Sequence, residues 1–242
     1  MKQNKYDDPA FFKAYAKMPR SSDGLKSAGE WEVFRAHLPK LFGKKILDLG
    51  CGYGWHCQYA VEQGADTVVG IDLSEKMLSK ARELTGKGKV ILEHCAIEDF
   101  DADEESFDVI FSSLVLHYVA DLSSVFRKAS KLLKSKGVLC YSVEHPVFTS
   151  NSSQDWHYEN DKIQHWPLDN YFHEGKRKTK FLGSEVIKYH RTIETHISAL
   201  LSEGFEISSL LEPKPSDEMV KKMGWYDEQR RPMMLIVTAT KR

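Results

Sequence analysis

A glycine-rich turn contains the residues of this chain best suited to binding a ligand. Asp48, Gly50, Gly52 and Gly54 come directly after a short apolar run. Glycines let the backbone turn sharply and approach a ligand closely, and the amides at the start of the next helix point toward that ligand. The third glycine of a Gly-x-Gly-x-x-Gly dinucleotide fingerprint would fall on Trp55, which argues against that motif. A phosphate-binding loop is excluded because no Gly-Lys-Ser/Thr follows.

Two carboxylates indicate the charge of the expected ligand. Asp48 lies two residues before Gly50, where it would repel a pyrophosphate. Asp72 ends the next apolar run, where a carboxylate can accept hydrogen bonds from both hydroxyls of a ribose. The ligand is therefore expected to combine a ribose with a positive charge and no phosphate. S-adenosyl-L-methionine has both features, because its sulfur is a sulfonium.

Short apolar runs alternate with helical patterns through the middle of the chain. The runs predict strands at 45–49, 67–72, 89–93, 107–111 and 137–143. Apolar residues at helical spacing predict helices over 74–84 and 122–133 between them. This alternation predicts a parallel sheet with right-handed crossovers. A helix over 193–201 and strands over 205–211 and 233–240 follow, and the polar link 212–231 is long enough for the last strand to run antiparallel.

Residues 145–190 do not fit this alternation. Eight aromatic residues and five of the ten histidines lie in this segment. A long insertion in a compact domain is usually a lid, a binding loop or a disordered segment. Its aromatic content favours a lid over the substrate, inserted after the fifth strand.

Three motifs occur in order between residues 40 and 145. They are Ile46–Gly54, Val69–Ser74 and Phe107–Ser112. In this order and spacing they resemble the class I S-adenosylmethionine-dependent methyltransferases, and in particular the small-molecule enzymes of methyltransferase type 11. The resemblance implies transfer of a methyl group from S-adenosyl-L-methionine to an acceptor by in-line displacement.

The resemblance also implies a fold. The chain is expected to form a single α/β domain over 1–242, with a Rossmann-like, mostly parallel sheet of seven strands flanked by helices. The implied strand order is 3-2-1-4-5-7-6, with strand 7 antiparallel. Residues 1–40 resemble the helices that cover the cofactor in this family.

Contacts to the cofactor can be assigned by the same resemblance. The implied residues are Tyr15, Arg20, Asp48, Gly50, Cys51, Gly52, Asp72, Leu73, Met77, Ala96, Ile97 and Ser112. Among them, Asp72 would hold the ribose, Leu73 and Met77 would pack on the adenine, and Arg20 would pair with the methionine carboxylate. A solvated arginine is the alternative for Arg20. Ala96 stands where the family often has an acid, so only backbone contact with the adenine is expected there.

Two histidines are the candidate catalytic residues. His117 follows the fourth predicted strand and His145 follows the fifth. An unperturbed histidine titrates near pH 6.5, which suits a general base, although His117 could equally be a packing residue and His145 a substrate contact. The histidines of the insertion are spaced about eight residues apart, which is not a compact ligand pattern. We therefore expect no metal site.

Composition limits the classes of protein and of acceptor. A formal net charge of -1 argues against a surface that tracks phosphate backbones. A small organic acceptor is therefore favoured over RNA, although the basic run 176–180, read as a solvated loop, keeps an RNA-base methyltransferase as an alternative. A non-catalytic module that senses S-adenosylmethionine is a second alternative, and a dehydrogenase is a distant third.

Location and partners can be predicted only broadly. The chain has four cysteines without a Cys-x-x-Cys pair, no apolar leader and no run of the roughly 18 apolar residues that a membrane span needs. These features predict a cytoplasmic protein with no membrane partner, as a monomer or homodimer.

Overall fold

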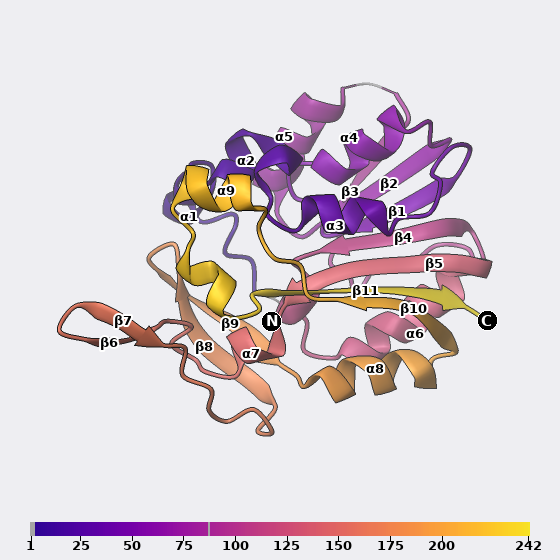
Figure 1. The fold of residues 1–242 in the computed structure, drawn as a ribbon. Coiled ribbons are helices and arrows are strands. Elements are labelled where there is room, and N and C mark those ends of the chain that lie inside the picture. The colour runs from indigo at the N-terminus through magenta and orange to yellow at the C-terminus, as the bar shows by residue number, and fades with distance from the viewer. Residues whose placement is uncertain (1–2, 87) are drawn as a thin grey trace.

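A seven-stranded sheet forms the centre of the computed structural model, which describes residues 3–86 and 88–242. The strands are β1 (Lys45–Leu49), β2 (Thr67–Asp72), β3 (Val90–His94), β4 (Phe107–Ser113), β5 (Leu133–Glu144), β10 (Phe205–Leu211) and β11 (Met234–Lys241). Their order is β10-β11-β5-β4-β1-β2-β3, and β11 runs antiparallel to both β10 and β5, whereas the other neighbouring pairs are parallel (Figure 1). The predicted order and the reversed last strand are confirmed.

Helices cover both faces of the sheet. The helices on one face are α3 (Trp31–Ala36), α4 (Trp55–Glu62) and α5 (Glu75–Thr85), and those on the other are α6 (Leu122–Leu132) and α8 (Ile193–Ser202) (Figure 1). α6 buries all five residues of its apolar stripe, among them Val125 and Phe126. Ser74 caps α5 by accepting a hydrogen bond from the amide of Met77, as its position before the helical pattern predicts. Within the described residues, no helix combines the length and apolar character needed to cross a membrane.

The remaining elements gather at the edge of the sheet where the parallel strands end (Figure 1). They are α1 (Pro9–Tyr15), α2 (Pro19–Ser22), α7 (Pro146–Thr149), α9 (Asp217–Met223), β6 (His157–Glu159), β7 (Lys162–His165), β8 (Gly175–Phe181), β9 (Ser184–His190) and three short 3₁₀ turns at 24–27, 116–118 and 227–230. β6 and β7 form a hairpin that projects from the body, and β8 and β9 form a second hairpin. The N-terminal segment, the insertion and the 212–231 link thus share one end of the molecule.

The basic run 176–180 lies in a strand, so the prediction of a solvated loop there was wrong. It occupies β8, where Lys176, Lys178 and Lys180 are exposed and alternate with the less exposed Arg177 and the buried Thr179. Successive side chains of a strand point to opposite faces. The lysines are solvated, as expected, but their partner strand β9 fixes the backbone that carries them.

Three aromatic residues of the insertion pack around an arginine from the far end of the chain. The guanidinium of Arg231 lies 4.3 Å from the ring centre of Trp166, 4.8 Å from that of Phe148 and 5.2 Å from that of Trp156. Cation–π contacts of a desolvated arginine can each contribute about 2 kcal/mol. These contacts fasten the insertion to the segment that leads into β11.

Buried histidines make the stability of the fold depend on pH. Burial lowers the pKa of His56 and His196 to about 3 and that of His117 to about 4, while it raises the pKa of Asp48 to about 7. Between about pH 4 and 6.5 each histidine binds a proton only in the unfolded chain, whereas Asp48 holds one only in the folded state.

These four groups give the unfolded chain an excess of about two protons, which should lower the free energy of unfolding by about 3 kcal/mol for each pH unit of acidification below about 6.5. Urea unfolding at pH 7, 6 and 5 measures this slope. A stability that is flat across that range would contradict the burial of these histidines as neutral rings.

Candidate active site

A cavity of about 720 Å³ lies at the end of the sheet where β1, β2, β4 and β5 terminate. This volume is within the range of about 300–1,000 Å³ found for small-molecule sites. In parallel α/β sheets, ligands bind outside the carboxyl ends of the strands. The N-terminal segment, the insertion and the 212–231 link all contribute residues to its wall.

The glycine-rich turn forms one side of the cavity. Gly50, Gly52 and Gly54 all have positive φ, at 78°, 54° and 80°. A Cβ on Gly50 would lie 2.5 Å from Cγ2 of Val115, whereas a Cβ on Gly52 would project into open space. Gly50 and Gly52 line the cavity. The turn therefore brings bare backbone against any ligand, as its composition predicts.

Asp72 is held ready to accept hydrogen bonds from a ligand. Its carboxylate accepts bonds from the amides of Gly52 and Ser74, at 2.9 and 2.8 Å, and it lines the cavity. Burial is the largest influence on this group and raises its pKa. A carboxylate has about four lone-pair sites, so sites remain for the two hydroxyls of a ribose.

The predicted adenine contacts lie on the same wall of the cavity. Leu73, Met77, Ala96 and Ile97 all line it. Met77, Ala96 and Ile97 are buried, at 2%, 6% and 7% exposure, and are apolar. Their position next to Asp72 suits a nucleoside base.

Asp48 and Ser112 lie behind the turn and do not line the cavity. Asp48 is buried at 1% exposure and accepts a hydrogen bond from the thiol of Cys57 at 3.3 Å. Ser112 donates to the carbonyl of Leu49 at 3.1 Å. Cys51 lines only a smaller pocket of about 60 Å³ beside the turn. Asp48 and Ser112 thus support the turn from within the core, whereas contact between the backbone of Cys51 and the cofactor stays a prediction.

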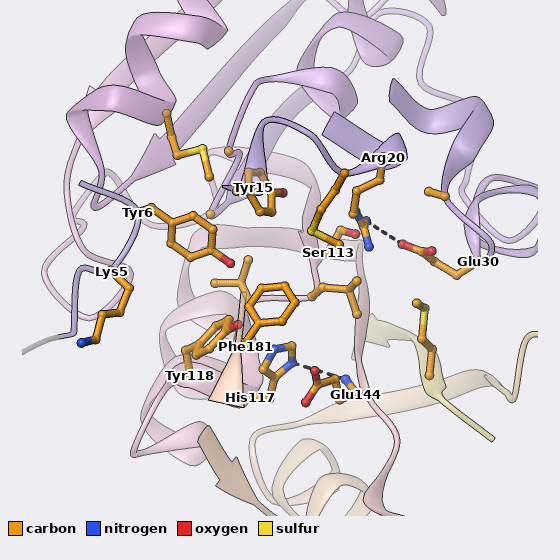
Figure 2. A pocket seen from close by; sticks show the side chains of 18 of the residues that line it. Lys5, Tyr6, Tyr15, Arg20, Glu30, Ser113, His117, Tyr118, Glu144 and Phe181 are labelled. Atoms are coloured by element: carbon orange, nitrogen blue, oxygen red, sulfur yellow. Dashed lines mark hydrogen bonds and ion pairs between the residues drawn. The ribbon is translucent and has the colours of Figure 1, made fainter. Parts of the chain in front are cut away.

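Arg20 and Tyr15 reach the cavity from the N-terminal helices. Arg20 forms an ion pair with Glu30, at 2.8 Å between Nη2 and Oε1, and both residues line the cavity (Figure 2). Tyr15 lies between the turn and Tyr6, with its ring 5.1 Å from that of Tyr6. Arg20, the predicted cation, therefore lies at the site, but it is already paired with Glu30.

The two candidate catalytic histidines are separated by the fold. His117 lines the cavity, and its Nδ1 accepts a hydrogen bond from the amide of Glu144 at 3.3 Å. Burial lowers its pKa to about 4, so it is neutral at pH 7 and carries its proton on Nε2. His145 lies outside the cavity, where its Nδ1 accepts from the amide of Val147 and caps α7. His117 is therefore a hydrogen-bond donor toward the cavity, and His145 supports a helix.

Replacing His145 with alanine should lower stability and leave the site intact. Loss of the cap costs about 1 kcal/mol of unfolding free energy. The affinity for S-adenosylmethionine and the turnover should not change, because His145 does not reach the cavity. Urea unfolding and calorimetry measure the two quantities. A drop in turnover at unchanged stability would return His145 to a catalytic role.

Several residues of the cavity wall were not predicted from the sequence. Tyr6, Glu30, Tyr118, Glu144 and Phe181 all line the cavity. Tyr118 and Glu144 were detectable in principle, because each lies at or just beyond the end of a central strand. Tyr6 and Phe181 come from segments whose path no local pattern predicts.

The segment that carries Tyr6 is tied to both sides of the cavity. Gln3 exchanges two hydrogen bonds with the backbone of Ile187 in β9, at 3.3 and 2.7 Å. Asp7 accepts a hydrogen bond from the hydroxyl of Ser74, next to the end of β2, at 2.6 Å. Tyr6 lies between these two anchors. The segment 3–8 therefore bridges the nucleoside side and the insertion.

Comparison with known proteins identifies the family. A family model described as a methyltransferase domain matches residues 47–141. The crystal structure of a proposed S-adenosylmethionine-dependent methyltransferase from Listeria monocytogenes is 48% identical, with a TM-score of 0.86 over 90% of this chain and 99% of that one. An S-adenosylmethionine-dependent methyltransferase from Mesorhizobium loti is 39% identical, with a TM-score of 0.85 over 90% of this chain and 100% of that one. The chain belongs to the class I S-adenosylmethionine-dependent methyltransferases. It is an enzyme whose cofactor is S-adenosyl-L-methionine.

Relatives of this methyltransferase differ in what they act on. A Haemophilus influenzae protein without an assigned activity is 36% identical over 98% of this chain and 96% of its own. A ubiquinone biosynthesis O-methyltransferase of Idiomarina loihiensis is 37% identical over 44% of each chain. A tRNA U34 carboxymethyltransferase of Methylococcus capsulatus is 35% identical over 37% of this chain and 28% of its own. The last two matches span less than half of each chain, and their acceptors differ.

The residues present fit the cofactor of this methyltransferase. The turn at Gly50 and Gly52 offers backbone without side chains, and Asp72 offers acceptor sites beside it. Arg20 can exchange Glu30 for the methionine carboxylate, since both groups lie at the cavity. Bound there, the cofactor supplies a methyl group on a positively charged sulfur, which needs no further activation as a leaving group.

Proposed function

We propose that this methyltransferase transfers the methyl group to a small organic molecule. The observation that carries the proposal is the acceptor side of the cavity, which is built by the chain's own N-terminal segment and insertion. Tyr6, Phe181, Ile187 and Tyr189 from these two segments all line it. A wall of this kind suits a small molecule better than a polymer that must enter from outside.

The charges around the cavity also favour a small molecule over RNA. Among the described residues, the acidic members of the wall are Glu30, Asp72, Glu98, Glu144 and Glu228, and the cationic ones are Lys5 and Arg20. RNA-binding sites need cations that neutralise phosphates. The exposed lysines of β8 are the feature that supports the alternative, an RNA-base methyltransferase.

The residues around the cavity have roles in positioning rather than in proton transfer. In-line displacement requires the acceptor atom, the methyl carbon and the sulfur to be aligned, and water to be excluded. The segments 1–40 and 145–190 serve as cover and lid in this proposal. His117 donates from Nε2 to the acceptor molecule, and its low pKa makes it a poor base.

A labelled-methyl assay tests the proposal. The enzyme is incubated with methyl-labelled S-adenosylmethionine and cell extract, and the product is divided by ultrafiltration before and after ribonuclease treatment. We expect the label in the small-molecule fraction without ribonuclease. Label that passes the filter only after ribonuclease treatment would establish the RNA alternative, and binding without any transfer would establish a sensor.

A further inference from the structure

Apolar side chains line the cavity on the side of β5 and β11. These two strands lie across β1 from β2 and β3, and Met234 at the start of β11 pairs with Glu144 at the end of β5. The wall there includes partly buried apolar residues from β9, the 212–231 link and the start of β11, namely Ile187, Pro213, Met233 and Met234. A ligand that covers such surface gains free energy by removing it from water.

The carboxylate of Glu144 on this side already has a partner at each oxygen. Its Oε1 pairs with the ammonium of Lys188 at 2.5 Å, and its Oε2 accepts a hydrogen bond from Gln154 at 3.0 Å. The side chain of Lys188 is 2% exposed, and its ammonium lies 5.4 Å from the ring centre of Phe181. A cationic ligand would have to displace Lys188, so Glu144 does not serve as its countercharge.

The other charges near this side are neutralised or directed away. Glu228 pairs with Arg231 at 2.8 Å, and Glu30 pairs with Arg20 at 2.8 Å where the methionine carboxylate is expected. Lys5 lies at the edge of the cavity, and Figure 2 shows its ammonium directed away from the other side chains. Among the described residues, the wall beside β5 and β11 therefore offers a ligand no uncompensated charge of either sign.

The remaining polar groups on this side are neutral. Burial lowers the pKa of His117 to about 4, so its ring is uncharged, and the other polar groups are the hydroxyls of Tyr118 and Tyr189. Burying an ion without a partner is strongly unfavourable. An apolar wall with a few neutral hydrogen-bonding groups instead binds and orients an uncharged molecule.

We propose that the methyl acceptor is an uncharged, mainly apolar small molecule that packs on Ile187, Met233 and Met234. This rests on the proposed function, because it names the acceptor of the same site. A heteroatom that carries hydrogen donates its lone pair to the methyl carbon, and the electrons of the broken S–C bond stay on sulfur. The hydrogen leaves as a proton to water. The products are S-adenosylhomocysteine, the methylated molecule and one proton.

Solvent extraction tests the charge of the acceptor. A cell extract is shaken with ethyl acetate at pH 2, 7 and 11, and each layer is then assayed at pH 7 with the enzyme and methyl-labelled S-adenosylmethionine. Only the uncharged form of a molecule leaves water, so an acid enters ethyl acetate at pH 2 alone and an amine at pH 11 alone. We expect the acceptor activity in the organic layer at pH 7.

The possible failures of this extraction are distinct. Small-molecule acceptor activity that leaves the aqueous layer only at pH 2 or only at pH 11, or that stays in it throughout, overturns the uncharged, apolar acceptor and leaves the proposed function intact. Label that stays in the aqueous layer and passes an ultrafilter only after ribonuclease treatment contradicts the proposed function itself.

Ile187→Thr tests the apolar wall. Threonine keeps the branched shape suited to a strand and the backbone groups that bind Gln3, but it places a hydroxyl where isoleucine has an ethyl group. Ile163→Thr makes the same change in β7 of the same insertion, at a residue outside the cavity wall, and is the matched control.

We expect Ile187→Thr to need about tenfold more of the pH 7 organic extract for half-maximal rate, the size of losing two buried methylene groups. Its Kd for S-adenosylmethionine should not change, and the control should behave as the wild type. An unchanged requirement for extract overturns the proposal. So does a requirement of the wild type that rises with ionic strength, because salt weakens the binding of a charged acceptor.

Discussion

Replacing Asp72 with asparagine should weaken S-adenosylmethionine binding by about 1–3 kcal/mol, or roughly 5- to 150-fold in Kd. The carboxylate already accepts hydrogen bonds from the amides of Gly52 and Ser74. Asparagine has a single acceptor oxygen, so it cannot serve both amides and both ribose hydroxyls. Calorimetric titration with S-adenosylmethionine measures the loss.

A control separates this effect from a general loss of negative charge. Asp66 is exposed and directly precedes β2, the strand that Asp72 ends. Asp66→Asn should bind the cofactor as the wild type does. Equal affinity of the Asp72 variant and the control would show that the ribose lies elsewhere in the cavity.

Replacing Lys188 with methionine should cost about 3–5 kcal/mol of unfolding free energy, the range measured when one member of a buried ion pair is removed. The side chain of Lys188 is 2% exposed, and the carboxylate of Glu144 would lose its countercharge. Gln154 would lose one of the two donors to its oxygen as well, and Thr179 would remain. Urea unfolding at pH 7 measures the change.

The double variant with Glu144→Gln should recover most of that loss, because replacing both members of a buried pair with uncharged groups is often neutral. A double-mutant cycle of the wild type, Lys188→Met, Glu144→Gln and the double variant gives the coupling free energy between Lys188 and Glu144. Single and double variants that are equally destabilised would show that Lys188 acts through packing rather than charge.

The strands and the position of Asp72 could be predicted because local patterns encode them, whereas the strand order and the adenine contacts were implied by the family resemblance. The apolar runs alternate with helical stripes, and the glycines before Trp55 indicate a tight turn that brings the backbone close to a ligand. Asp72 is placed by the end of its own strand, since the carboxyl end of β2 is where the cavity begins. Each of these inferences depends on residues near one another in the chain.

The acceptor side could not be predicted in the same way. Aromatic content alone does not say which rings line a cavity: Phe181 and Tyr189 do, whereas Trp166 packs on Arg231 instead. His145 directly follows a central strand, as a residue of the site would, yet its backbone begins α7 and its side chain does not line the cavity. These choices depend on how 145–190 folds back over the sheet, which is set by contacts between distant segments.

The bridge formed by residues 3–8 has a consequence for how the two reactants are handled. One end is tied to the backbone of Ile187 in β9 and the other to Ser74, immediately beyond β2. A ligand that orders either anchor lowers the entropic cost of ordering the other. The short tether thus links occupancy of one half to affinity in the other, and the coupling acts equally in both directions.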